Sequence, residues 1–145
     1  MDEELLARSF VVRGRDFDRA GESSTEIKAL LKELEIDPAV IRRAVVIAFE
    51  AEMNVVMYAD EGTVSFVLTD EDIAIEVADQ GPGIPDLDLA MQEGWSTATD
   101  EMREMGFGFG MGLPNIRRNA DACEITSEVG RGTTIACRIK LDGDA

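Results

Sequence analysis

The feature that most constrains the fold is a long helical pattern in the first half of the chain, DPAVIRRAVVIAFEAEMNVVMYA, residues 37–59. Asp37 stands at the N-cap position and Pro38 at the first helical position, a combination that predicts a helix start. Apolar side chains then recur at helical spacing along one stripe, made up of Val45, Ala48, Phe49, Val55, Val56 and Ala59. A helix with such a stripe buries it against another layer, and we expect that layer to be a sheet.

A carboxylate and an amide lie on this helix outside the apolar stripe. Glu50 and Asn54 are four residues apart, so they stand one turn apart and point the same way. Taken alone, they are compatible with ordinary polar positions on the solvent side of the helix. A second carboxylate, Glu52, is only two residues from Glu50 and should therefore point elsewhere.

Strand patterns flank this helix on both sides. RSFVVRG, residues 8–14, alternates and is short, which predicts an edge strand. Residues 63–81 contain two strand-like runs around the turn TDED, and residues 122–141 form a second hairpin around EVGRG. We therefore predict an α+β fold, a two-layer α/β sandwich with helices packed on one face of a mostly antiparallel sheet.

Two further segments complete the layout. Residues 23–36, SSTEIKALLKELEI, read as a helix with Ser23 and Glu26 at capping-box spacing. Residues 85–120 begin and end with helix-like pieces around a long middle that is rich in glycine. Long loops inside a compact domain are usually functional.

Charge and length limit the class of protein. The formal net charge of −16 argues against nucleic-acid binding, which normally shows a basic surface. No apolar run approaches the roughly 18 residues that mark a bilayer span. The acidic start MDEELLARSF also lacks the pattern of a signal peptide. We expect a cytoplasmic protein with no membrane or nucleic-acid partner, folded as one domain over residues 1–145.

The spacing of the cysteines and the absence of histidine limit the kinds of metal site, disulfide and catalytic group that the chain can have. Cys123 and Cys137 lie fourteen residues apart, and the chain has neither a CxxC motif nor any histidine. This pattern disfavours a zinc site and a disulfide scaffold, so we expect two reduced thiols. A histidine-based catalytic triad and phosphorylation on a histidine of this chain are excluded.

Three glycine-containing motifs follow the central helix. In DQGPGIPD, residues 79–86, Asp79 ends a strand and offers a carboxylate that can accept a hydrogen bond from an exocyclic amine such as adenine's. GFGFGMGLPN, residues 106–115, precedes a helix and offers backbone amides suited to phosphate. GRGTT, residues 130–134, is a hairpin turn. Each motif alone is equally compatible with a turn or a flexible loop.

Together the motifs have an informative order: E-x-x-x-N, D-x-G-x-G, G-x-G-x-G-x-G-L and G-x-G-T. This order resembles the GHKL (Bergerat-fold) ATPases. The resemblance covers roughly residues 8–141 and is nearest to the small anti-sigma-factor serine/threonine kinases. EAEMNVVMYA, DQGPGI, GWSTA, GMGLPNIRR and SEVGRGTT all resemble that branch.

The resemblance implies ATP and Mg²⁺ as cofactors and assigns a role to each matching residue. Glu50 would be the catalytic base, and Asn54 would bind the nucleotide's Mg²⁺. Asp79 would bind the adenine amine, and a lid over about residues 86–110 would cover the nucleotide. The other nucleotide-binding positions would be Gly81, Gly83, Ile84, Gly106, Gly108, Gly110, Met111, Gly112, Leu113 and Thr133.

The function implied is a Mg-ATP-dependent protein serine/threonine kinase of a partner-switching, anti-sigma regulatory system. Its substrate would be a small antagonist protein of the anti-anti-sigma type, and a sigma factor would be a second candidate partner. Members of the branch differ in dimerisation, so a homodimer stays open. The bulky Phe107 and Phe109 depart from the usual phosphate loop. Together with the strong acidity, they leave open a nucleotide-gated interaction module without kinase activity. A histidine-kinase-like domain acting on a separate chain is the remaining alternative.

Overall fold

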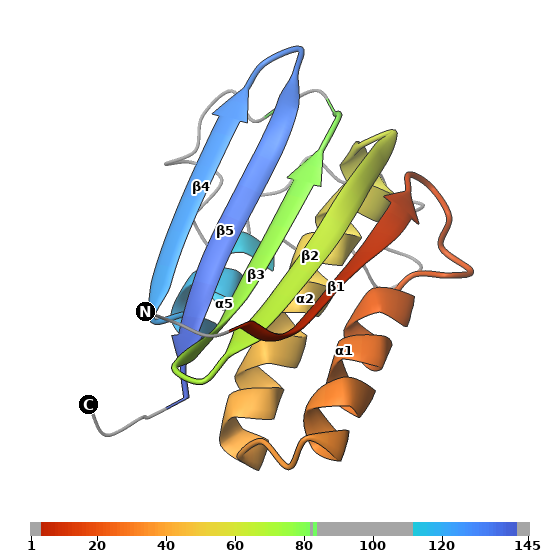
Figure 1. Ribbon diagram of the computed structural model, residues 1–145. Coiled ribbons are helices and arrows are strands. Elements are labelled where there is room, and N and C mark those ends of the chain that lie inside the picture. The colour runs from red at the N-terminus through yellow and green to blue at the C-terminus, as the bar shows by residue number, and fades with distance from the viewer. Residues whose placement is uncertain (1–3, 82, 84–111, 142–145) are drawn as a thin grey trace.

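The computed structural model describes residues 4–81, 83 and 112–141. Figure 1 shows one sheet with helices on a single side of it. In chain order the elements are β1 (Glu4–Arg13), α1 (Glu22–Glu33), α2 (Pro38–Tyr58), β2 (Glu61–Thr69), β3 (Asp72–Asp79), α5 (Gly112–Asn119), β4 (Ala122–Glu128) and β5 (Gly132–Lys140). The predicted α+β two-layer sandwich is confirmed.

Within the described residues the sheet has five antiparallel strands in the order β1-β2-β3-β5-β4. β1 lies at one edge, as predicted for residues 8–14, although the strand begins earlier, at Glu4, and is not short. β4 lies at the other edge. Both predicted hairpins form: β2 and β3 join at residues 70–71, and β4 and β5 join at residues 129–131. Because β5 inserts between β3 and β4, the end of β3 lies next to the start of β5.

The core lies between the sheet and α2. Alternate residues of the central strands are buried toward the helices, as the two-residue period of a strand requires. Four residues of the predicted helical stripe are also buried, whereas Val45 and Phe49 are only half-buried. α2 is buried on more than one side because α1 and α5 flank it, and Ile47 and Met53 therefore join the core.

The N-terminal end of α1 differs from the sequence prediction. The helix begins at Glu22 and its N-cap is Gly21, without any side-chain capping bond. The predicted capping box of Ser23 and Glu26 is therefore wrong. The free N–H groups instead donate to Glu52 of α2, from Gly21 at 3.1 Å, Ser23 at 3.4 Å and Ser24 at 3.3 Å. A tertiary contact has replaced the local cap.

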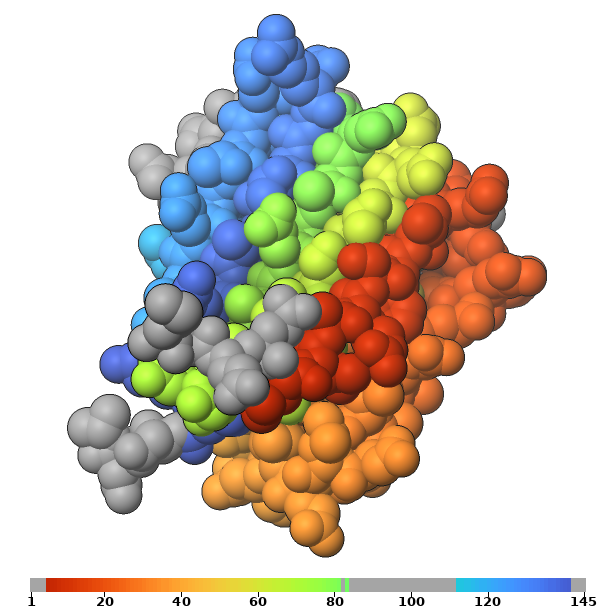
Figure 2. All heavy atoms as spheres, viewed as in Figure 1, coloured from red at the N-terminus to blue at the C-terminus, as the bar shows by residue number. Residues whose placement is uncertain are grey.

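The other face of the sheet carries no helix from the described part of the chain. Figure 2 shows strands reaching the surface side by side on this face. Its side chains are mostly small, including Ser65, Val67, Ala74 and Ala136, each of which is half-buried. The described motif residues lie elsewhere: Glu50 and Asn54 are on α2, and Asp79 meets the G-x-G-T turn where β3 ends and β5 begins.

Candidate nucleotide site

Glu50 and Asn54 form one wall of the candidate site, on the α2 face predicted from their spacing. Both side chains are half-buried. The first turn of α5 lies beside them, and a Cβ added to Gly112 would stand 3.6 Å from Glu50 Oε2 and 3.8 Å from Asn54 Oδ1. The structure therefore brings together the carboxylate, the amide oxygen and the start of a helix.

Asn115 is a neighbour of Glu50 that sequence reasoning missed. Its Nδ2 donates to Glu50 Oε2 at 3.3 Å. This contact joins α5 to α2 across 65 positions of sequence, and no local pattern signals it. The only hint in the sequence is that Asn115 is the last residue of the GFGFGMGLPN motif and falls in the first turn of the helix that begins there.

α5 is fixed on α2 by packing and by one arginine. Ile116 is fully buried and Leu113 nearly so, which anchors the apolar side of the helix. At its C-terminal end, Arg43 Nε donates to the carbonyl oxygen of Asn119 at 2.8 Å. The same guanidinium lies 3.1 Å from Asp121. Because cations stabilise helix C-termini, this contact holds α5 against α2 and keeps its first turn beside Glu50.

Asp79 forms the second part of the site, at the end of β3. Its Oδ1 accepts a hydrogen bond at 3.1 Å from the backbone N–H of Thr133 on β5. Thr133 is itself buried, and its hydroxyl lies 2.9 Å from that of Ser127. Burial raises the pKa of the Asp79 carboxyl above its usual value, while the N–H groups of Thr133 and Gly81 act in the opposite direction. The strand-end aspartate and the G-x-G-T turn are thus in direct contact.

Two glycines allow the chain to pass close to Asp79 and to the β4–β5 turn. Gly132 has a φ of +139°, and a Cβ there would overlap the carbonyl oxygen of Asp79. Gly83 has a φ of +79°, and its Cβ would come within 2.5 Å of the carbonyl oxygen of Glu128. A side chain at either position would push the two strand ends apart.

Several predicted site residues cannot be placed. Ile84, Gly106, Gly108, Gly110 and Met111 lie outside the described residues, as do the expected lid at 86–110, Phe107 and Phe109. Gly81 lies beside α2, where an added Cβ would stand 3.0 Å from Ala59. Leu113 contributes its side chain to the core.

The donor chemistry of the site fits a hard cation bound with a phosphate. Mg²⁺ prefers oxygen ligands and usually takes one or two from the protein and the rest from phosphate and water. Asn54 Oδ1 provides one such oxygen at a half-buried position. Among the described residues there is no cluster of three or more cysteine, aspartate and glutamate side chains that could hold a metal by themselves.

Comparison with known proteins agrees with this geometry. Residues 39–143 match the family described as histidine kinase-, DNA gyrase B- and HSP90-like ATPase. The chain belongs to this ATPase family. The match includes α2, the strand-end aspartate and the β4–β5 hairpin. In the described residues of this family member, no helix combines the length and apolar character needed to cross a membrane.

Several curated relatives are named as anti-sigma F factors, and another is named as a serine/threonine-protein kinase. Serine/threonine-protein kinase RsbT of Bacillus subtilis is 33% identical over 90 residues, which cover 59% of this chain and 62% of that protein. The anti-sigma F factor of Clostridium acetobutylicum is 29% identical over 147 residues, which cover 97% of this chain and 93% of that protein. The predicted resemblance to this branch is confirmed.

Another relative has a different architecture. The sensor histidine kinase DpiB of Escherichia coli is 41% identical over 113 residues, covering 72% of this chain but only 18% of that protein. The matches to the first curated relatives, RsbT and an anti-sigma F factor of Caldanaerobacter subterraneus, span about three fifths of their length. The similarity to these relatives therefore extends over part of their length.

Proposed function

We propose that this ATPase-family protein is a Mg-ATP-dependent protein serine/threonine kinase of a partner-switching system. Its substrate would be a hydroxyl group on a small antagonist protein of the anti-anti-sigma type, and a sigma factor would be a second partner. The observation that carries the proposal is the placement of Glu50 beside Asn54 and Gly112, at the start of α5. The names of the relatives favour a protein substrate over other phosphate acceptors.

One part of the site, around Asp79, suits the adenine of ATP, and the other part, at the start of α5, suits the phosphates. Asp79 would accept a hydrogen bond from the adenine amine, with Gly81, Gly83 and Thr133 around the base. The start of α5 at Gly112 would face the phosphates, because the free N–H groups of a helix N-terminus attract anions. Ile84, Gly106, Gly108, Gly110, Met111 and Leu113 complete the proposed nucleotide-binding set.

Asn54 would hold the Mg²⁺ that accompanies the phosphates, and the ion would neutralise part of their charge. This matters because the protein carries a net charge of −16, which repels a nucleotide at long range. Charges on distant parts of the surface are screened beyond about 8 Å at physiological salt. The metal and the local amides therefore dominate at contact distance.

Glu50 would accept the proton of the attacking hydroxyl. Its carboxylate stands one helical turn from the proposed metal ligand and is half-buried, so a hydroxyl near the metal-bound phosphate would lie within its reach. Most of the catalysis in phosphoryl transfer comes from positioning and charge stabilisation, and a base adds to both by orienting the nucleophile.

One contact favours a second candidate, a nucleotide-gated interaction module of the same fold without kinase activity. Asn115 already donates a hydrogen bond to Glu50 Oε2, so this oxygen has a partner on α5. A carboxylate used in this way could serve as a link between α2 and α5 instead of a base.

Transfer of the γ-phosphate from labelled Mg-ATP to proteins of the source cell's extract separates the two candidates. A kinase should label one small protein on serine or threonine, and omission of Mg²⁺ should abolish the labelling. Saturable ATP binding without any labelled protein would support the interaction module. Failure to bind ATP at all would contradict both.

The role of Asp79 predicts a defined loss of nucleotide affinity. Asp79→Asn removes the negative charge from the acceptor but keeps its size, so a charge-assisted hydrogen bond becomes a neutral one. We expect ATP to bind about tenfold more weakly, corresponding to about 1.4 kcal/mol. Inosine triphosphate, which lacks the amine, is the matched control in an equilibrium binding titration. Equal weakening for both nucleotides would show that Asp79 does not recognise the amine.

Nucleotide binding should also depend on pH through Asp79. Burial raises the pKa of this carboxyl above 3.8, so it becomes protonated at a higher pH than an exposed aspartate. A protonated carboxyl loses its charge as an acceptor, so ATP affinity should fall as the pH drops through this raised pKa. Binding measured between about pH 7 and pH 4 should show this step in the wild type but not in Asp79→Asn. A step of equal size in both proteins would assign it to the ATP phosphates.

A further inference from the structure

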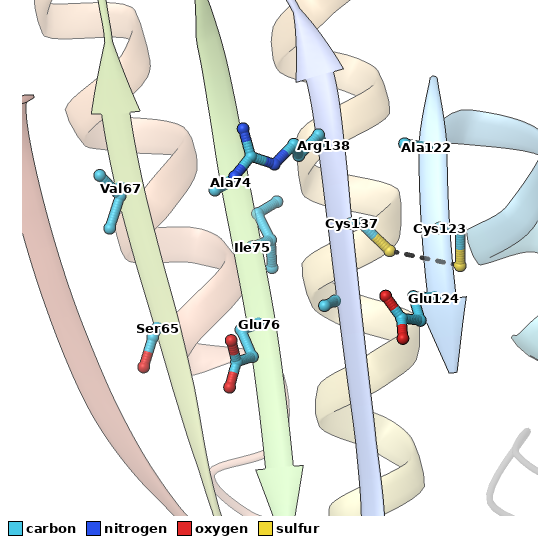
Figure 3. Close-up of a pocket in the computed structure, with 11 residues that line it drawn as sticks. Ser65, Val67, Ala74, Ile75, Glu76, Ala122, Cys123, Glu124, Cys137 and Arg138 are labelled. Carbon is cyan, nitrogen blue, oxygen red and sulfur yellow. Dashed lines mark hydrogen bonds between the residues drawn. The ribbon is translucent and has the colours of Figure 1, made fainter. Parts of the chain in front are cut away.

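The two cysteines lie face to face on neighbouring strands, outside the nucleotide site. Cys123 of β4 and Cys137 of β5 are direct partners in the antiparallel register. The Cys137 thiol donates to the Cys123 sulfur, with 3.6 Å between the two Sγ atoms. Figure 3 shows both side chains converging between β5 and β4. Both are free thiols in the structure.

The strand geometry permits a bond between these sulfurs without moving the backbone far. Directly opposed residues of an antiparallel pair have Cα atoms about 4.5–5.5 Å apart, which lies within the 4.4–6.8 Å usual for disulfides. A disulfide bond is about 2.05 Å long, so the sulfurs must approach by about 1.5 Å in total. Small rotations about the two Cα–Cβ bonds can supply that movement.

The two thiols differ in exposure and in proton affinity. Cys123 lies on the edge strand and is half-buried, whereas Cys137 is 3% exposed. The hydrogen bond from Cys137, aided by the positive charge of Arg117 on α5, lowers the pKa of Cys123 to about 7. The same contact and burial raise the pKa of Cys137. Cys123 therefore has the properties of the nucleophilic cysteine, and Cys137 has those of the resolving cysteine.

Both cysteines also contribute to the pocket in Figure 3, whose lining includes Glu124 and Arg138. This pocket opens on the sheet, away from Asp79 and Glu50. Because side chains alternate along β5, Arg138 lies on the open face of the sheet, whereas the Cys137 side chain lies on the core side. An oxidant therefore reaches the pair at Cys123, the half-buried cysteine on the edge strand, without passing through the nucleotide site.

We propose that Cys123 and Cys137 form a reversible intramolecular disulfide when the protein meets a hydroperoxide. Cys123 is the thiol that reacts first and Cys137 is the thiol that resolves the product. This modification site does not depend on the proposed kinase activity, since neither cysteine belongs to the nucleotide site.

The chemistry balances in two steps. The Cys123 thiolate attacks the outer oxygen of the hydroperoxide; an S–O bond forms, the O–O bond breaks, and the remainder leaves as an alcohol or water after taking up a proton. Cys137 Sγ then attacks Cys123 Sγ; the S–S bond forms, and the hydroxyl leaves as water with the proton of Cys137. Two thiols are oxidised by two electrons in total, and one hydroperoxide is reduced.

The test is oxidation of the full chain with hydrogen peroxide, followed by non-reducing peptide mapping and a count of free thiols after denaturation. Mapping is needed because the chain has seven methionines that peroxide can also oxidise. We expect both thiols to disappear together, one cross-linked peptide pair to appear within a single chain, and dithiothreitol to restore both thiols.

Single variants test the order of events. Cys137→Ser should stop at a sulfenic acid on Cys123, which a sulfenic-acid-specific reagent captures. Cys123→Ser should leave Cys137 reduced, with thiol loss slowed about tenfold or more because the remaining thiol is buried. Persistence of both thiols in the wild type, direct formation of a Cys123 sulfinic acid, or a disulfide only between two chains would each overturn the proposal. Peptide mapping and thiol counting of the oxidised wild type test the proposal even if a variant fails to fold.

Discussion

Replacing Glu50 by glutamine is expected to lower the rate of phosphoryl transfer by about 10²- to 10⁴-fold, the usual effect of removing a general base. Glutamine keeps the size of the side chain and an oxygen that can still accept from Asn115, so α5 should stay in place. The proposed adenine-binding residue, Asp79, is on another element, so ATP affinity should be almost unchanged. Single-turnover transfer to the labelled substrate and an ATP titration measure the two effects separately.

A matched control is Glu33→Gln, which makes the same chemical change at an exposed position of α1. It should transfer phosphate at the wild-type rate. If Glu50→Gln and Glu33→Gln both equal the wild type in transfer, Glu50 is not the base. Its hydrogen bond to Asn115 would then be its main role, and the interaction module would become the better proposal.

Replacing Glu52 by alanine should destabilise the protein by about 3 kcal/mol or more. Glu52 is 2% exposed and accepts hydrogen bonds from the N–H groups of Gly21, Ser23 and Ser24. Its removal leaves these N–H groups at the buried start of α1 without acceptors, and each unsatisfied buried group costs about 1–3 kcal/mol. It also removes a negative charge from a helix N-terminus, where such a charge is favourable.

Urea unfolding measures this effect, with Glu33→Ala as the control. An exposed glutamate to alanine change on α1, the helix whose start Glu52 contacts, should alter the free energy of unfolding by no more than about 0.5 kcal/mol. Glu52→Gln should fall between the two, because its amide oxygen can accept from one or two of the N–H groups. A loss below about 1 kcal/mol for Glu52→Ala would mean that water or a shifted serine hydroxyl caps the helix equally well.

Substitution of Glu50 should thus mainly lower the rate of phosphoryl transfer, whereas substitution of Glu52 should mainly lower the stability. The two carboxylates are only two residues apart. Glu50 and Glu52 point to different sides of α2, which their spacing alone predicts. What their spacing could not predict is the environment on each side. Glu50 faces the half-buried start of α5, whereas Glu52 is enclosed at the start of α1.

Local features were readable from the amino-acid sequence because their causes are local. Asp37 caps α2 by accepting from the N–H of Ala39, as the Asp-Pro start predicts. The strands show the alternation expected of a sheet with one covered face. The side-by-side position of Glu50 and Asn54 follows from helix geometry alone, and the order of the motifs indicated the ATPase family before any fold was known.

The tertiary structure alone decided which distant residues meet. The N–H of Thr133 reaches Asp79 across 54 positions, and Asn115 reaches Glu50 across 65. The cap of α1 moved from the expected Ser23 to Glu52 because a buried carboxylate on α2 can satisfy several N–H groups at once. Likewise, the fourteen-residue spacing of the cysteines does not predict the strand register that places Cys123 opposite Cys137. Secondary structure depends on neighbours in sequence, whereas these contacts depend on how strands and helices pack.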